Sequence, residues 1–252
     1  MQRDKIIAKL DDILQPEQFD DYCPNGLQVE GTENIKSLVS AVSASQTLIN
    51  KAVELKADAI LVHHGLVWKG EDQRICGIKA KRLKALLENN INLIAYHLPL
   101  DAHPKFGNNA ELARLLGITV SGNFTDIGSV PYAFYGKLPS PMTSMELHQK
   151  IQRTFQREPM VIAASTEDRI STVAWCSGAA QNLIDQAARL GVDAYISGEI
   201  SEHTVHKARE LKVDYFAIGH HASERYGVQA LGKHLAQKFG IRHAYIELDN
   251  PV

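Results

Sequence analysis

The chain has 252 residues, with 44% hydrophobic and 22% charged side chains, which is ordinary globular composition and long enough for two modest domains. Its 27 basic and 29 acidic side chains nearly balance, so the overall charge argues against a nucleic-acid or anionic-membrane partner. No apolar run reaches the roughly 18 residues that a membrane helix needs, and the charged start predicts no signal peptide. Three widely spaced cysteines without a CxxC pair indicate reduced thiols, so we expect a cytoplasmic protein: Cys23, Cys76 and Cys176.

The first elements alternate between helix and strand. Apolar residues at helical spacing predict a helix from Asp4 to Leu14, which Pro16 ends. A strand at Leu38–Val42, a helix from Gln46 to about Leu55 and a buried strand at Ala59–Val62 follow. This order is a βαβ unit, which predicts a largely parallel sheet.

That buried strand ends on a histidine pair, His63-His64, followed by Gly65. Adjacent strand residues point to opposite faces, so the two imidazoles reach one metal only if the strand bends, or they serve two neighbouring metals. Gly65 supplies the freedom for a bend. The alternative is one buried, hydrogen-bonded histidine and one exposed histidine.

A histidine and a carboxylate four residues apart occur twice, each time after an apolar strand. The first copy is His97 with Asp101, and the second is His220 with Glu224, at an offset of 123 residues. On a helix this spacing puts both side chains on one face. Imidazole and carboxylate are ligands of divalent transition metals, so the recurrence predicts a metal site.

Identical residues also recur at an offset of 135, including Gln46 with Gln181 and Asp58 with Asp193, which predicts an internal duplication. We expect an α/β protein of two similar lobes, 1–125 and 126–252, with the boundary near Asn123–Val130. Each lobe would have a largely parallel central sheet flanked by helices, with the metal site in the cleft between the lobes.

The second half has further expected elements. These are an extra strand–helix segment at about 130–162 with a capping box at Thr143–Glu146, a helix at Gln181–Leu190 and a closing strand at Ala244–Leu248. In the first half, a polar loop at Trp68–Gly77 is expected either to act as a lid or to decorate the surface.

The candidate metal ligands are three imidazoles and two carboxylates: His63, His64, Asp101, His220 and Glu224. Two divalent ions close together need a bridging group, and we assign the bridge to Glu224 because of its longer side chain. His97 is either a sixth ligand or a residue that holds a ligating carboxylate, and we assign catalytic roles to His97 and Glu224. Zinc, iron, manganese and nickel suit this ligand set comparably. Other polar side chains nearby are expected to line the pocket, to contact substrate or to lie on the surface: His103, Glu199, His203 and His221.

These motifs give the chain a resemblance to the GTP cyclohydrolase I type 2, or Nif-three-like, family of dinuclear-metal proteins. The resemblance runs essentially end to end and is carried by Pro24–Val29, Val62–His64, His97–Asp101 and Gly219–Glu224. It implies two divalent metals on the five ligands above and a toroidal homohexamer, a trimer of dimers, with sites facing a central cavity. Many members have proline after the histidine pair; Gly65 here would loosen that turn.

Two functions are compatible with these features. The first is a dinuclear-metal-dependent hydrolase that acts on a purine nucleotide or related small molecule through a metal-activated water. The sequence contains no Gly-rich phosphate loop, so recognition of a nucleotide would rest on cavity side chains. The second is a non-catalytic, metal-binding oligomeric scaffold or stress-response adaptor. A nucleic-acid partner would need a local basic patch, for which Lys79, Lys81, Arg82 and Lys84 are the candidates.

Overall fold

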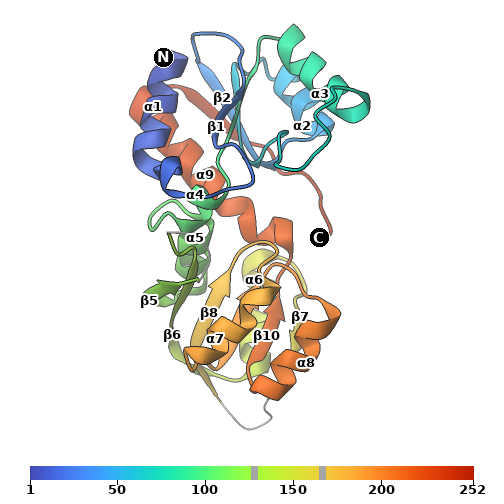
Figure 1. Ribbon diagram of the computed structural model, residues 1–252. Helices are drawn as coiled ribbons and strands as arrows, with labels where there is room; N and C mark the ends of the chain where they lie inside the picture. The colour runs from blue at the N-terminus through green and yellow to red at the C-terminus, as the bar shows by residue number, and fades with distance from the viewer. Residues whose placement is uncertain (126–129, 165–168) are drawn as a thin grey trace. The chain divides into compact units, whose positions relative to one another are not determined.

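The computed structural model describes residues 1–125, 130–164 and 169–252, which form two compact units (Figure 1). The first unit consists of Met1–Leu100 and Gly227–Asp249, and the second of Asp101–Tyr226 and Asn250–Val252. These units differ from the expected halves, because residues 101–125 belong to the second unit and residues 227–249 to the first. The expected boundary near Asn123–Val130 includes residues 126–129, which lie outside the described residues.

The first unit contains, within the described ranges, a five-stranded sheet in the order β1-β4-β3-β2-β11. Strands β4, β3, β2 and β11 are parallel, and β1 pairs antiparallel with β4, so this sheet is largely parallel as expected. Its elements are α1 (Arg3–Leu14), η1 (Pro16–Gln18), β1 (Gly26–Val29), β2 (Ser37–Ser43), α2 (Gln46–Glu54), β3 (Ala59–His64), α3 (Gly77–Glu88), β4 (Asn92–Ala95), the later part of α9 (His220–Phe239) and β11 (Arg242–Tyr245).

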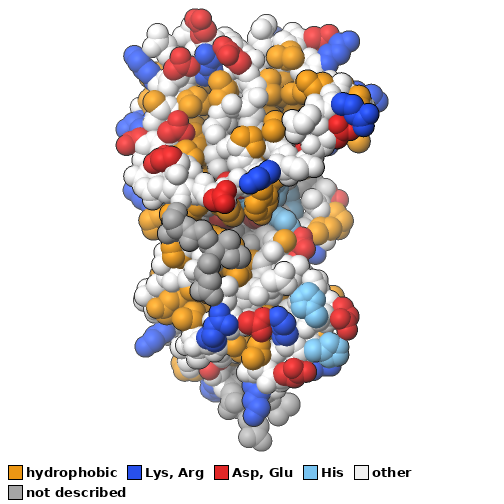
Figure 2. Space-filling view, in the orientation of Figure 1, with side chains coloured by type: hydrophobic (Ala, Val, Ile, Leu, Met, Phe, Trp, Pro, Cys, Tyr) orange, Lys and Arg blue, Asp and Glu red, His pale blue; other side chains and the backbone are white. Residues whose placement is uncertain are grey.

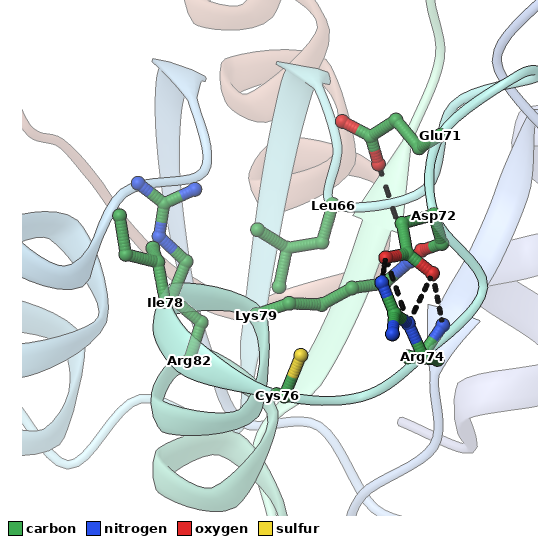
Figure 3. A pocket seen from close by; sticks show the side chains of 8 residues that line it. All are labelled: Leu66, Glu71, Asp72, Arg74, Cys76, Ile78, Lys79 and Arg82. Carbon is green, nitrogen blue, oxygen red and sulfur yellow. Dashed lines mark hydrogen bonds and ion pairs between the residues drawn. The ribbon is translucent and has the colours of Figure 1, made fainter.

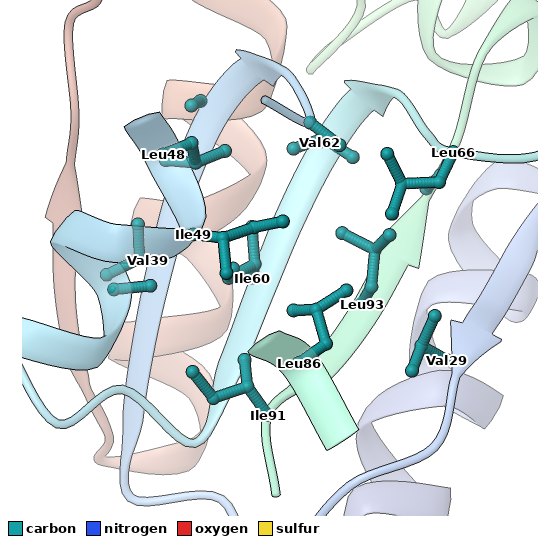
Figure 4. Close-up of a cluster of buried hydrophobic side chains, with 14 of the residues drawn as sticks. Val29, Val39, Leu48, Ile49, Ile60, Val62, Leu66, Leu86, Ile91 and Leu93 are labelled. Carbon is teal, nitrogen blue, oxygen red and sulfur yellow. The ribbon is translucent and has the colours of Figure 1, made fainter. Parts of the chain in front are cut away.

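One core of this unit lies between the sheet and helices α2 and α3 (Figure 4). Leu48 and Ile49 of α2 and Leu86 of α3 pack there against strand residues such as Ile60 and Leu93. Strand β3 is buried at every position before His64, as expected for a parallel strand covered on both faces. The Ser45 side chain caps α2 by accepting a hydrogen bond from the amide of Leu48, which fixes where the helix begins.

The second unit contains, over its described residues, a six-stranded sheet in the order β5-β6-β8-β9-β10-β7. Only the central strands β8, β9 and β10 are parallel; β5, β6 and β7 pair antiparallel, so this sheet is mixed rather than largely parallel. Its elements are the end of α4 (Leu98–Ala102), α5 (Asn108–Leu116), β5 (Thr119–Phe124), β6 (Ala133–Met142), α6 (Ser144–Phe155), β7 (Met160–Ile162), β8 (Ile170–Cys176), η2 (Gln181–Leu183), α7 (Ile184–Arg189), β9 (Ala194–Ser197), α8 (Glu202–Leu211), β10 (Asp214–Ala217) and the start of α9.

Alternating residues of the central strands build two cores in the second unit. Val173 and Trp175 of β8 face the core with α5 and α6, whereas Ala174 and Cys176 face the core with α7 and α8. This alternation is the period of two expected for a strand with helices on both faces. The extra segment is present as β6, α6 and β7, and α6 has the capping box predicted at Thr143. The helix expected at Gln181–Leu190 is divided into η2 and α7.

Both signs of charge occur on the visible face of each unit. Figure 2 shows basic and acidic side chains interspersed, in line with the near balance of 27 and 29 charges. None of the helices in the described part of the chain has the length and apolar character needed to cross a membrane.

Candidate metal site

The histidine pair of the first unit closes strand β3. The rings of His63 and His64 have their centroids only 4.6 Å apart, so the two imidazoles lie side by side. His64 is the last residue of β3, where the chain leaves the regular strand. The turn that follows is not loose: the Gln28 side chain accepts a hydrogen bond from the amide of Leu66 at 2.8 Å. A Cβ on Gly65 would lie 2.1 Å from the same Gln28 oxygen, so glycine makes room for this contact.

Both members of the pair use Nδ1 for a hydrogen bond within the unit. His63 Nδ1 donates to the carbonyl oxygen of Tyr96 at 3.0 Å, which makes Nδ1 the protonated nitrogen. His64 Nδ1 shares a hydrogen bond of 2.8 Å with the Ser43 hydroxyl. Metal-binding histidines in proteins are oriented in this way, with one ring nitrogen held by a neighbour and the other left as the ligand atom.

His97 joins the pair at the end of β4. Its ring centroid lies 4.9 Å from that of His63 and 5.7 Å from that of His64. His97 Nδ1 donates to the Asp21 carboxylate at 2.8 Å, and both side chains are more than nine-tenths buried. One ring nitrogen from each of His63, His64 and His97 lies within 4.8 Å of the other two, so these three imidazoles could hold a metal ion.

The second unit supplies carboxylates. Asp101 is 5% exposed, and its Oδ1 accepts hydrogen bonds from Asn108 Nδ2 and Ser177 Oγ, both at 2.8 Å. Glu224 is 2% exposed, and one of its oxygens lies within 4.8 Å of an Asp101 oxygen. Two buried carboxylates so close together repel each other unless a cation lies near them. Their placement therefore fits a site for positive charge.

His220 lies at the start of α9 between two carboxylates. Its Nδ1 donates to Glu199 Oε1 at 2.7 Å, and its Nε2 lies 3.2 Å from Glu224 Oε2. Burial by itself lowers the pKa of His220, but the hydrogen bonds and charges of Glu224 and Glu199 outweigh it and raise this pKa to about 9. The pair of carboxylates attracts a cation strongly enough to retain a proton here, and a divalent ion is favoured for the same reason.

Gly178 packs closely against the side chains of Glu224 and His220. It has a φ of +67°, and a Cβ at this position would lie 2.4 Å from Glu224 Oε1 and 3.3 Å from His220 Nε2. Only glycine allows the loop after β8 to come so close to the two candidate ligands. No sequence motif marks this position.

Three other histidines make contacts outside these ligand groups. His103 Nδ1 accepts from the amides of residues 105 and 106 at 3.1 and 2.9 Å, which caps its own turn. His203 Nε2 lies on the exposed side of the unit, 3.0 Å from Asn182 Oδ1. His221 is buried directly after His220. None of the three is in a group of candidate ligands within the described ranges.

The residues that orient the candidate ligands are mostly invisible in the sequence patterns. Asp21 is 76 residues from His97, and Ser177 is 76 residues from Asp101. Asp21 precedes the Pro24–Val29 motif by only a few residues, where an aspartate is typical of a turn cap. It does accept a hydrogen bond from the amide of Cys23, but it also orients His97.

The loop expected at Trp68–Gly77 lines a pocket of about 390 Å³ in the first unit together with Leu66 and helix α3 (Figure 3). Asp72 pairs with Arg74 at its rim, and Leu66 lies at its centre. None of the residues that line it is among the five predicted metal ligands.

Comparison with known proteins gives one consistent result. The family model described as Duf34/NIF3 (NGG1p interacting factor 3) matches residues 1–251. The "GTP cyclohydrolase 1 type 2 homolog" of Vibrio cholerae is 49% identical over 249 residues and covers 98% of both chains. The Escherichia coli K12 protein of the same name is 45% identical over 251 residues and covers 100% of both.

Solved structures agree with these matches. The structure of protein ybgI, of unknown function, superposes with a TM-score of 0.96 at 45% identity over 100% of both chains. TTHA1606 from Thermus thermophilus gives 0.90 at 33% identity, again over 100% of both chains. Reduced HcgD from Methanocaldococcus jannaschii gives 0.85 at 25% identity over 98% of both chains. The resemblance stated from the sequence motifs is confirmed.

Proposed function

The chain belongs to the Duf34/NIF3 family, and from this membership and the ligand groups described above we propose that it is a metal-dependent hydrolase acting on a purine nucleotide or related small molecule. The observation that carries the proposal is the orientation of the candidate ligands. His63, His64, His97 and His220 each have Nδ1 engaged by a neighbouring group, which directs Nε2 toward other ligands.

We propose that two divalent ions are shared by His63, His64, Asp101, His220 and Glu224, with Glu224 as the bridge. The sequence supports the idea, because His97, a member of the imidazole group, is only four residues from Asp101 in the chain. Zinc, iron, manganese and nickel all suit this mixture of nitrogen and oxygen donors.

When bound, such ions lower the pKa of a coordinated water toward neutrality and polarise the bond under attack. The protein's own groups would orient the reactants and move protons. Asp21 holds the proton of His97 on Nδ1, so Nε2 is left as an acceptor that can take a proton from water or substrate. Ser177 and Asn108 keep the Asp101 carboxylate fixed by donating hydrogen bonds to it.

The names of the relatives suggest a substrate class. The Vibrio cholerae and Escherichia coli proteins are named as homologs of a GTP cyclohydrolase, which favours attack of water on an electron-poor ring carbon. Hydrolysis of a phosphoester would use the same ligands equally well.

The test combines metal analysis of untagged protein with turnover assays on GTP and a panel of nucleotides and phosphoesters. We expect metal-loaded protein to convert a nucleotide, and Glu224→Gln to lose both metal and turnover. Glu202→Gln is the matched control, because Glu202 is an exposed glutamate that pairs with His206 on α8. If metal-loaded and metal-free proteins are equally inert across the panel, the hydrolase proposal is wrong and the scaffold alternative takes its place.

We also propose that the protein is a cytoplasmic homohexamer, arranged as a toroidal trimer of dimers. Six chains of 27.9 kDa would have a mass of about 167 kDa in solution. Light scattering after size-exclusion chromatography separates this mass from that of a monomer or dimer, and cell fractionation tests the location.

A further inference from the structure

Two aromatic side chains lie beside the histidine group of the first unit. The ring of Tyr22 has its centroid 5.0 Å from that of His97, and the ring of Trp68 lies 5.3 Å from His97 and 5.8 Å from His64. The two aromatic rings are 6.0 Å apart with planes inclined by 33°. Neither residue belongs to the metal-ligand motifs of the sequence.

Tyr22 is unusual in its exposure. Its side chain is 53% exposed, and no other aromatic residue in the described part of the chain is exposed to this degree. Burying such a ring would stabilise the fold by roughly 1.5–3 kcal/mol. An exposed ring does not contribute this stabilisation, whereas the buried rings of the core do. Trp68 is partly buried against the hydrophobic core, so its ring is anchored on one side.

Hydrogen bonds of Asp21 and of the Tyr22 carbonyl oxygen fix the loop that carries Tyr22. Asp21 accepts hydrogen bonds from Cys23 N, Asn25 Nδ2, His97 Nδ1 and Leu98 N at 2.8–3.1 Å. The amide of Lys69 donates to the carbonyl oxygen of Tyr22 at 2.7 Å, which ties this loop to the one carrying Trp68. The exposed ring is therefore preorganised rather than displayed on a free loop, and a preorganised surface loses little entropy on binding.

We propose that Tyr22, supported by Trp68, is the surface on which a planar heteroaromatic ring of the substrate stacks, next to the candidate metal ligands His64 and His97. This inference rests on the proposed function and narrows its substrate class to compounds that carry a ring such as a purine. Aromatic side chains bind any nucleobase through its face, with a contribution of about 1–3 kcal/mol per stacked base. The ring centroids of 5.0–5.8 Å from the imidazoles put a stacked ring within one substrate's length of the metal ligands.

The experiment compares binding of GMP and ribose 5-phosphate, which share the sugar phosphate and differ in the base. Calorimetry on zinc-loaded protein should show that Tyr22→Ala raises the Kd of GMP about tenfold or more and changes that of ribose 5-phosphate less than about twofold. Tyr22→Trp should retain GMP affinity. Tyr245→Ala is the matched control, because Tyr245 is a partly exposed tyrosine on β11 in the same unit, and it should bind GMP like the unaltered protein.

Fluorescence gives a second readout. The chain has two tryptophans, and Trp175 is fully buried in the second unit, so GMP stacking near Trp68 should quench a signal that Trp68→Phe removes. The inference is wrong if GMP does not bind, if Tyr22→Ala leaves GMP binding unchanged, or if it weakens both ligands equally. Absence of GMP binding leaves hydrolysis of ring-free phosphoesters open, whereas ring-dependent binding without any turnover removes the hydrolase proposal and keeps the stacking surface.

Discussion

The two units offer different donor chemistry from similar stretches of sequence. In the first unit three imidazoles gather at the ends of β3 and β4, each with Nδ1 held by a hydroxyl, a carbonyl or a carboxylate. In the second unit two buried carboxylates and one imidazole gather at the end of α4 and the start of α9. The motif that occurs twice is therefore not used twice in the same way: His97 and Asp101 fall in different units, whereas His220 and Glu224 stay in one.

The difference teaches that the surroundings, rather than the motif, decide how each histidine is held. His97 is fixed by the buried Asp21, which also accepts backbone hydrogen bonds. His220 is fixed by Glu199, whose side chain is 33% exposed. In the first unit, the carboxylate that holds His97 is also hydrogen-bonded to the backbone. In the second unit, His220 is held by Glu199 and lies beside the carboxylate of Glu224.

The largest effect is expected from closing the space beside the carboxylates. Gly178→Ala should lower metal affinity by about 100-fold or more, because the new Cβ would lie 2.4 Å from Glu224 Oε1. Gly191→Ala is the control, since its φ of +70° carries the same backbone strain while nothing lies within 4 Å of its Cβ. Titration with zinc measures both variants. Equal loss of affinity in the two would show that strain, and not Glu224, is responsible.

The second prediction contrasts the carboxylates that orient the two histidines. Asp21→Asn and Glu199→Gln should each weaken metal binding by about 10- to 100-fold. Asp21→Asn should also lower the free energy of unfolding by about 1–3 kcal/mol, because it leaves a buried donor of the Tyr22 loop without an acceptor. Glu199→Gln should change stability by less than about 1 kcal/mol. Urea unfolding of metal-free protein measures this contrast, which fails if the two variants are equally destabilised.

The third prediction concerns the two serines that support candidate ligands. Ser177→Ala should lower the free energy of unfolding by about 1 kcal/mol, because it removes the hydroxyl that donates a hydrogen bond to the buried Asp101 carboxylate. Ser43→Ala should cost less, because its partner His64 is half-buried and water can replace the hydroxyl. Thermal unfolding of both variants checks the order. The reverse order would contradict the view that a hydrogen bond to the buried Asp101 contributes more than one to the half-buried His64.

The smallest effect concerns a first-unit histidine away from the ligand group. Burial, assisted by Lys233, lowers the pKa of His243, which is hydrogen-bonded to Ser40. Its stabilising contribution is therefore fully present above the unfolded pKa of about 6.5 and is lost as pH falls toward the lower folded value. The free energy of unfolding is measured at pH values of about 7.5 and about 5.5, on either side of that unfolded pKa. Acidification should lower it less for His243→Asn than for the unaltered protein. An equal loss would place the titration elsewhere.

Local signals determined much of this protein. Helical periodicity predicted α1 and α2, and the capping box at Thr143 predicted the start of α6. Apolar runs predicted β3, which ends on the histidine pair, and the strands β4 and β10, which precede His97 and His220 by a few residues. Local sequence patterns also identified the candidate ligands, because the histidines and carboxylates that follow the apolar strands lie within a few residues of one another. The metal, the number of ions and the assembly stay predictions.

Tertiary structure alone decided which neighbours those ligands have and which unit each segment joins. Tyr245 of β11 pairs with Ser40 of β2, a partner 205 residues earlier, so the closing strand completes the first sheet instead of the second. Asp21 reaches His97 and Ser177 reaches Asp101 across 76 residues. Such contacts follow from how sheets and helices pack, since a buried imidazole or carboxylate must find its hydrogen bonds in space and not in the adjacent sequence.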